Sequence, residues 1–81
     1  VLVTITQRSG RALDDAELHE KFDLTPREIE IARCLAAGLQ NKEIGARLGI
    51  STFTARNHVE KVLAKLGVDG RAKVGIVLRG E

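Results

Sequence analysis

Apolar residues recur at helical spacing over most of the chain from Thr25 onwards. The segment Thr25-Pro26-Arg27-Glu28 combines a capping hydroxyl, a proline suited to the first helical position and a glutamate three residues after the cap. Gly38 supplies a residue that tolerates the left-handed backbone at a helix end. The pattern predicts a first helix between Thr25 and Gly38, with an apolar stripe formed by Ile31, Ala32, Leu35 and Ala36.

Three further helices are predicted after the first. Asn41 offers a cap for a second, shorter helix that runs through Leu48. The triplet Gly49-Ile50-Ser51 follows with a glycine for a sharp turn, an apolar residue and a serine cap. A third helix is predicted over Thr52–Leu66, ended by Gly67, and a fourth over Arg71–Leu78. The core face of the third helix consists of Ala55, Val59, Val62, Leu63 and Leu66.

The first 24 residues show weaker signals. Val1–Thr6 is rich in β-branched residues and predicts a short strand, followed by a turn. Asp14–Phe22 predicts a short helix with Asp14 or Asp15 at its N-terminal end. Ile29 lies off the main apolar stripe of the first long helix, so we expect it to pack against this short helix. A lone strand is not stable by itself, and residues 1–23 are interpreted as an extension or the remnant of an upstream sensor domain.

Two glycines and an isoleucine between Gly45 and Ile50 have the spacing of a helix-turn-helix. In this motif two helices cross so closely that the first carries only a small residue at the contact, the turn needs a left-handed residue and an apolar residue seals the crossing. Gly45, Gly49 and Ile50 fill these roles in order. The expected fold class is therefore all-α, a four-helix helix-turn-helix bundle over residues 24–81 with a short N-terminal strand and helix extension.

A helix-turn-helix holds its second helix out from the surface, where its N-terminal half enters the major groove of DNA. With one face of Thr52–Leu66 assigned to the core, the outward residues become candidates for base contacts, and these are Phe53, Arg56, Asn57 and Glu60. Arg can bind guanine through two hydrogen bonds, and Asn can bind adenine in the same way. Candidates for phosphate contacts lie on the flanks, and these are Lys42, Thr52, Thr54, His58, Lys61 and Lys65.

The distribution of charge favours a nucleic-acid partner, although the formal net charge is only +2. Residues 1–24 hold three Lys or Arg against five Asp or Glu, whereas residues 25–81 hold ten against six. The basic character therefore lies where a phosphate backbone is expected to bind.

Composition argues against several other classes. A chain of 81 residues suffices for one core but rarely encloses a deep catalytic cleft, and we find no nucleophile with a base, no paired carboxylates and no phosphate-binding glycine loop. The single cysteine, Cys34, rules out an internal disulfide and a zinc pair, and is expected to be a small buried hydrophobe. The longest apolar run, residues 1–6, is far short of a membrane span. We expect a cytoplasmic protein that is not an enzyme and uses no metal, cofactor or small-molecule ligand.

Several separated motifs resemble the LuxR-type DNA-binding domain of bacterial response regulators and quorum sensors. They are Leu24-Thr-Pro-Arg-Glu-Ile-Glu, Ala37-Gly-Leu-Gln-Asn-Lys-Glu-Ile, Leu48-Gly-Ile-Ser, Asn57-His-Val and Lys65-Leu-Gly-Val. The resemblance covers residues 24–79 and implies a homodimer on an inverted repeat of double-stranded DNA, with bacterial RNA polymerase as a further partner. It implies base contacts by Arg56 and Asn57, backbone contacts by Lys42, Thr54 and Lys61, and a dimer interface at Val74, Val77 and Leu78.

This chain departs from the family pattern at three positions. Ala55 stands where the family usually has valine, Phe53 where the residue is normally polar, and Glu60 where a basic residue is common. A carboxylate repels phosphate but can accept a hydrogen bond from cytosine. The departures predict an unusual target sequence.

Two alternatives remain besides a DNA-binding regulator domain. The fourth region of bacterial sigma factors has a similar pattern but is normally fused to polymerase-binding segments. A helix-turn-helix that only dimerises or binds protein is favoured by Glu60 and the modest net charge. Salt distinguishes this second alternative from DNA binding, because affinity for a duplex falls steeply as salt rises.

Overall fold

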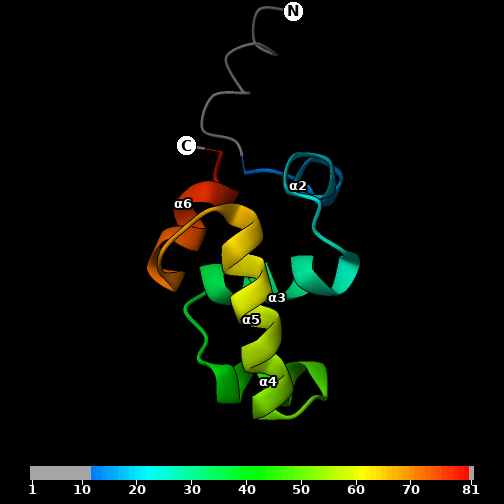
Figure 1. The fold of residues 1–81 in the computed structure, drawn as a ribbon, viewed down its shortest axis with the longest axis vertical. Helices are drawn as coiled ribbons and strands as arrows, with labels where there is room; N and C mark the ends of the chain where they lie inside the picture. The colour runs from blue at the N-terminus through cyan, green and yellow to red at the C-terminus, as the bar shows by residue number, and fades with distance from the viewer. Residues whose placement is uncertain (1–11, 81) are drawn as a thin grey trace, which may run out of the picture.

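The computed structural model describes residues 12–80, and their regular structure is entirely helical (Figure 1). The elements in chain order are α2 (Asp15–Phe22), α3 (Pro26–Ala36), α4 (Asn41–Leu48), α5 (Thr52–Leu66), the 3-10 helix η1 (Arg71–Lys73) and α6 (Val74–Leu78). The all-α class is confirmed, as are the bounds predicted for the third helix. The predicted fourth helix forms in two parts, η1 and α6. The strand predicted at residues 1–6 lies outside the described residues.

Reciprocal side-chain caps explain where α2 and α3 begin. The Glu28 backbone N–H donates to Thr25 Oγ1 at 3.2 Å, and the Thr25 N–H donates to Glu28 Oε1 at 2.9 Å. Asp14 and Glu17 form the same pair of bonds at the start of α2, at 2.8 and 2.9 Å. Each pair satisfies two backbone donors near the start of its helix. Both predicted helix starts are confirmed.

The predicted cap of α4 was wrong by one residue. Gln40 is the N-cap, and its backbone N–H donates to Glu43 Oε1 at 2.7 Å. Asn41 is already helical, and its Oδ1 accepts a hydrogen bond from Arg71 Nη2 at 2.5 Å. Arg71 also donates to the Leu39 carbonyl at 3.2 Å. The Asn41 amide therefore ties the start of α4 to η1 instead of capping a helix.

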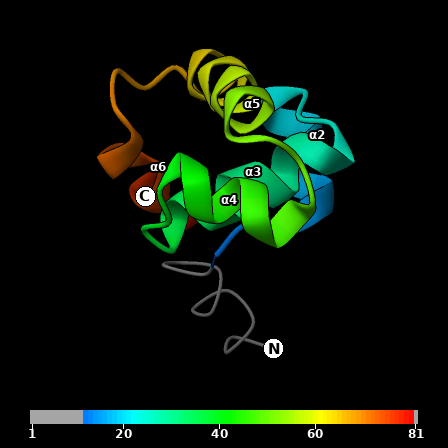
Figure 2. The same ribbon diagram turned by 90° about the horizontal axis from the view of Figure 1, so that it is seen from below.

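Helix α3 lies at the centre of the bundle and contacts α2, α5, η1 and α6, as Figures 1 and 2 show. Ile29 is 6% exposed and belongs to the same buried cluster as Leu18 of α2, with Phe22 packed against that cluster. Ile29 is thus buried, as expected, in the core to which α2 also contributes. The largest fully buried side chains come from five of the helices and the loop before α3, and they are Leu18, Leu24, Ile31, Ile44, Val62 and Val74.

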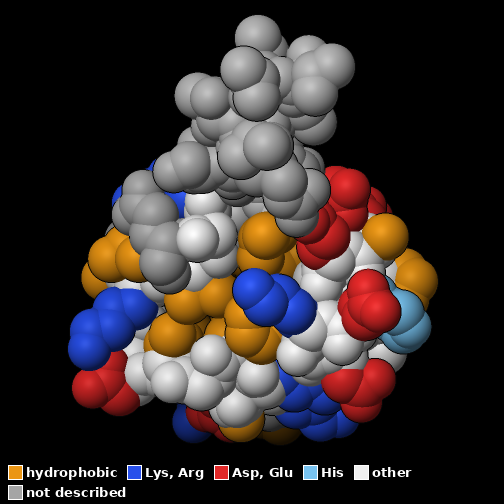
Figure 3. All heavy atoms as spheres, turned by 90° about the horizontal axis from the view of Figure 1, so that it is seen from above, with side chains coloured by type: hydrophobic (Ala, Val, Ile, Leu, Met, Phe, Trp, Pro, Cys, Tyr) orange, Lys and Arg blue, Asp and Glu red, His pale blue; other side chains and the backbone are white. Residues whose placement is uncertain are grey.

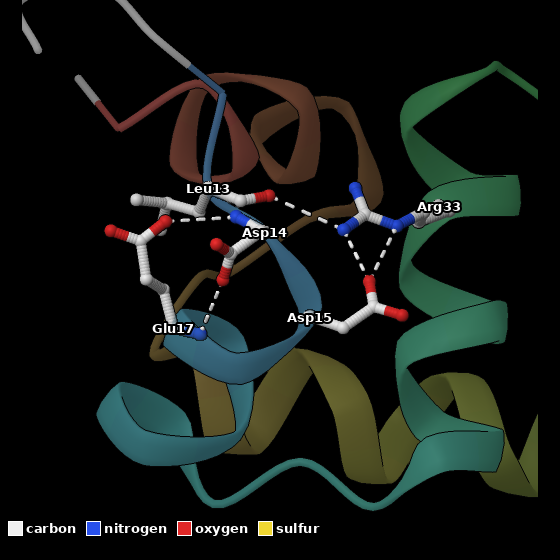
Figure 4. A network of polar contacts seen from close by, with 5 residues as sticks. All are labelled: Leu13, Asp14, Asp15, Glu17 and Arg33. Carbon is white, nitrogen blue, oxygen red and sulfur yellow. Dashed lines mark hydrogen bonds and ion pairs between the residues drawn. The ribbon is translucent and has the colours of Figure 1, made fainter.

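Polar contacts join the start of α2 to α3, as Figure 4 shows, and to α6. The Arg33 guanidinium donates to Asp15 Oδ1 at 2.5 Å and to the Leu13 carbonyl at 3.2 Å. The Leu13 N–H donates to the Leu78 carbonyl at 2.8 Å. Asp and Glu side chains gather on the α2 side of the molecule in Figure 3. Residues 12–22 thus share the core of the helices that follow. Their acidic side chains lie on the surface of the molecule.

A partly buried ion pair joins α3 to the C-terminal end of α5. Lys65 Nζ lies 2.7 Å from Glu28 Oε1 and 2.8 Å from the Asp23 carbonyl, and the side chains of Lys65 and Glu28 are 32% and 8% exposed. Burial by itself raises the pKa of Glu28, but the Lys65 ammonium and the Thr25 backbone N–H together hold that pKa below its ordinary value. Glu28 therefore caps α3 and anchors α5 with one carboxylate.

We expect Glu28→Gln to lower the free energy of unfolding at neutral pH by about 1–2 kcal/mol, because the amide keeps the cap but loses the charge facing Lys65. Since folding lowers the pKa of Glu28, its carboxylate stabilises the fold above the ordinary carboxyl pKa, and this contribution disappears as the pH falls through the lowered value. The variant should therefore lose less stability than the wild type between about pH 6 and about pH 3. Urea unfolding followed by circular dichroism measures both effects.

Glu20→Gln is the matched control, because Glu20 is an exposed carboxylate on α2. It should leave the stability and its pH dependence close to those of the wild type. An identical acid response of the wild type and Glu28→Gln would contradict the role assigned to the ion pair.

Candidate nucleic-acid interface

A glycine permits the close crossing of α4 and α5. A Cβ atom on Gly45 would lie 2.7 Å from the Ile50 carbonyl oxygen, a distance that side-chain carbons do not tolerate. The Ile50 N–H donates to the Gly45 carbonyl at 2.9 Å, and Gly49 between them has a φ of 72°. Ile50 packs against the core. The helix-turn-helix roles predicted for these three residues are confirmed.

Ser51 sets the start of α5. The Thr54 N–H donates to Ser51 Oγ at 3.0 Å, and the Ser51 hydroxyl donates to Thr54 Oγ1 at 2.9 Å. Because Thr54 accepts in the second bond, its own hydroxyl hydrogen is not used there. The cap therefore holds Thr54, one of the predicted phosphate contacts, at the first turn of the exposed helix.

The two faces of α5 differ sharply in exposure. The inner face is buried, with Ala55, Val59, Val62 and Leu66 at most 6% exposed. On the outer face Phe53 is 68% exposed, and the side chains of Arg56 and Glu60 are 63% and 64% exposed. Asn57 is exposed beside them. Residues three or four apart in a helix lie on one side, so the structure brings the four predicted base-facing residues onto one open face.

An ion pair lies within this outer face. Arg56 Nε is 3.5 Å from Glu60 Oε2, one helical turn further along. Both groups are well exposed, so the pair contributes little to stability. The pair does orient Arg56, because the Glu60 carboxylate draws the Arg56 guanidinium along the helix face.

The predicted phosphate contacts do not all lie in comparable positions. Lys42, Thr52 and Lys61 are exposed, whereas Thr54 and His58 are partly buried. Lys65 is engaged by Glu28 and the Asp23 carbonyl at the far end of α5, as described above. A phosphate would have to compete with both partners, and we leave Lys65 out of the proposed DNA surface. No local signal in the sequence pairs it with a residue 37 positions away.

The role predicted for two residues of α6 also needs correction. Val74 and Leu78, expected at a dimer interface, are 0% and 4% exposed within the core of a single chain. A helix of five residues has one apolar stripe, and α6 uses that stripe against α3. The side chain that points outward is Ile76, 44% exposed, with Val77 partly buried beside it. Its position midway between Val74 and Leu78 was the available signal, because it places Ile76 on the opposite face.

Within residues 12–80, no three His, Cys, Asp or Glu side chains are grouped as metal ligands. Cys34 is buried with a free thiol, as predicted. Among these same residues no helix has the length and apolar character needed to cross a membrane.

A helix-turn-helix with an open second helix defines the class of protein, and comparison with known proteins identifies the family. Residues 23–78 match the sequence model of the bacterial regulatory proteins of the luxR family. The chain is 45% identical over 58 residues to the transcriptional regulatory protein LnrK of Bacillus subtilis (strain 168), covering 72% of this chain and 26% of LnrK. It is 34% identical over 74 residues to the nitrate/nitrite response regulator protein NarL of Escherichia coli (strain K12), covering 91% of this chain and 33% of NarL.

The spore germination protein GerE of Bacillus subtilis (strain 168) is similar over almost its whole length. It is 38% identical over 66 residues, which cover 82% of this chain and 89% of GerE. The chain therefore spans a quarter to a third of LnrK and NarL but most of GerE. It belongs to the luxR family of bacterial transcription regulators, and it carries their DNA-binding helix-turn-helix.

We expect Gly45→Ala to lower the free energy of unfolding by about 1–3 kcal/mol, because the new Cβ meets a backbone carbonyl that cannot rotate away. This loss should exceed the gain of roughly 1 kcal/mol that alanine brings to a helix interior. Thermal unfolding by circular dichroism measures the change.

Gly75→Ala is the matched control, because its Cβ would meet only Arg79 Nη1 at 3.5 Å and the Ala36 carbonyl at 3.9 Å. It should leave stability unchanged or raise it. If both variants were equally stable, the close crossing at Gly45 would not be a constraint.

Proposed function

We propose that this domain binds double-stranded DNA by sequence, with the N-terminal half of α5 in the major groove. The observation that carries the proposal is the open face of α5, on which Phe53, Arg56, Asn57 and Glu60 lie opposite the buried stripe. An α-helix about 10–12 Å wide fits a major groove about 12 Å wide. Membership in a family of transcription regulators supports this use of the face.

The chemistry of three side chains suits base edges. The Arg56 guanidinium can donate two parallel hydrogen bonds to guanine, and the Asn57 amide can donate to and accept from adenine. The Glu60 carboxylate can accept from the amino group of cytosine. Because Glu60 faces Arg56 at 3.5 Å, a guanine and a cytosine at neighbouring positions would engage both residues while their contact is kept.

Phosphate contacts would position the helix without reading sequence. Lys42 on α4 and Lys61 on α5 are exposed cations, and in this proposal they contact phosphates beside the open face. Thr52 and Thr54 carry hydroxyls at the start of α5, where the helix dipole favours an anion, and His58 lies one turn further on. These five residues form the proposed backbone-binding set.

A second copy of the domain would bind the other half of an inverted repeat. The outward side chain of α6, Ile76, together with Val77 offers an apolar patch. Helix α6 lies far from the start of α5 (Figure 1). We assign the dimer contact to these two residues, because Val74 and Leu78 are used within the chain. Pairing through α6 would leave both open faces of α5 free for DNA.

Two further parts of the proposal follow from its ligand. A domain that reads the bacterial chromosome works in the cytoplasm, and a regulator bound there lies within reach of RNA polymerase. The alternative of a protein-binding or dimerising module is favoured by the exposed apolar side chains of Phe53 and Ile76. It differs from DNA binding in its response to salt and to duplex sequence.

Arg56→Ala should weaken binding to a duplex selected from a random pool by about 1–3 kcal/mol and relax the preference at one base pair.

Lys61→Ala should weaken binding to all duplexes about equally and reduce the slope of log affinity against log salt by about one. Fluorescence anisotropy at several salt concentrations measures both.

The matched control is Lys21→Ala, which removes an exposed cation on α2 and should change neither affinity nor slope. If no duplex binds at low salt, or if affinity does not respond to salt, the protein-binding alternative replaces the DNA proposal.

Ile76→Asp should abolish cooperative binding to a duplex with two inverted half-sites, because a carboxylate in an apolar contact loses its hydration. Affinity for a single half-site should stay within about twofold of the wild type, a difference below about 0.5 kcal/mol. Mobility-shift titrations on both duplexes test this. Unchanged cooperativity would remove α6 from the dimer contact.

A further inference from the structure

Phe53 is an apolar side chain that lies outside the core of the fold. Among the described residues only Phe53 and Ile76 are large hydrophobic side chains left exposed, at 68% and 44%. Phe22, the other phenylalanine, packs against the core. Phe53 lies in the first turn of α5 between two threonines and does not support the bundle. The exposed ring is therefore available to a ligand.

The neighbours of Phe53 indicate which ligand that is. Arg56 and Asn57 follow it by three and four positions and lie on the same exposed face. Both carry hydrogen-bonding groups suited to base edges. The phenylalanine ring has no such group, so its partner in the same groove must be apolar. In the major groove the one apolar substituent on a base is the 5-methyl group of thymine.

We infer that Phe53 recognises thymine through this methyl group and makes the domain select a T·A pair at one position of its site. The inference rests on the proposed function and adds the base that Phe53 reads. The seven residue steps from Phe53 to Glu60 span about 10 Å of helix axis, or about three base-pair steps. The selected thymine therefore lies at one end of the segment that α5 reads, and the pair read by Glu60 lies at the other.

The groups around the Phe53 ring favour its contact with a methyl group over contact with a phosphate. Phe53 offers no donor to a phosphate, while the hydroxyls of Thr52 and Thr54 on either side of it do. The Arg56–Glu60 pair lies further along the helix than Phe53. The ring and the ion pair therefore face different positions of the groove.

The test uses the chain as it exists and a duplex selected by it from a random pool. Each thymine of that duplex is replaced singly by uracil, which lacks only the 5-methyl group. At one thymine per half-site the replacement should weaken wild-type binding by about fourfold, the change expected for one buried carbon group. Phe53→Ala should bind the thymine duplex more weakly and show no loss with uracil at that position.

Arg56→Ala is the matched comparison. It should bind more weakly than the wild type but keep the fourfold ratio between thymine and uracil, because it leaves the ring in place. Circular dichroism checks that each variant remains helical, and the exposure of Phe53 makes its removal harmless to the fold.

The outcomes separate the two levels of the proposal. If no duplex binds at low salt, the proposed function fails and takes this inference with it. If a duplex binds and responds to Arg56→Ala but no uracil substitution matters, only the role of Phe53 is overturned. Equal loss on both duplexes for Phe53→Ala also overturns it, since a ring inserted between bases would not depend on the methyl group.

Discussion

The close approach of α4 and α5 at Gly45 is the contact on which the exposed surface depends. No side chain fits between the Gly45 Cα and the Ile50 carbonyl, where a Cβ would stand at 2.7 Å. The turn through Gly49 and Ile50 is therefore short, and the Ser51 cap begins α5 immediately after it. Backbone meets backbone at this crossing, so no side chain separates α4 from α5 there. The crossing therefore fixes how the N-terminal end of α5, with its open face, is held against α4.

The opposite end of α5 is held by a different kind of contact. Lys65 reaches Glu28 and the Asp23 carbonyl, so an ion pair and a hydrogen bond attach the last turn of α5 to the start of α3. Glu28 at the same time caps α3. One end of α5 is thus fixed by steric fit and the other by charge. Between them the buried stripe of Ala55, Val59 and Val62 packs on the core, which leaves the outer side chains free to serve a ligand.

Acidic side chains are concentrated on α2, which contains Asp15, Glu17 and Glu20. Figure 3 shows Asp and Glu side chains gathered on this side of the molecule, and Arg33 pairs with Asp15. The formal net charge of the chain is only +2. Nonspecific attraction to phosphates grows with the number of cations engaged, so in the proposed complex the base contacts would carry much of the affinity. Phe53 and Glu60 add an apolar and an acceptor group to that face.

Local signals determined much of this protein. The caps at Thr25 and Ser51, the left-handed glycines and the apolar period of α5 all involve residues within four positions of one another, and each helix they predict is present. The four residues on the open face of α5 followed from the same period. Contacts between distant elements were decided only by the tertiary structure. The partners of Lys65 lie 37 and 42 positions away, and the partner of Asn41 lies 30 positions away. Packing against α3 likewise decided which side of α6 faces outward. Periodicity shows that a helix has an apolar stripe, but only the arrangement of its neighbours determines whether that stripe is covered by the same chain or left for another.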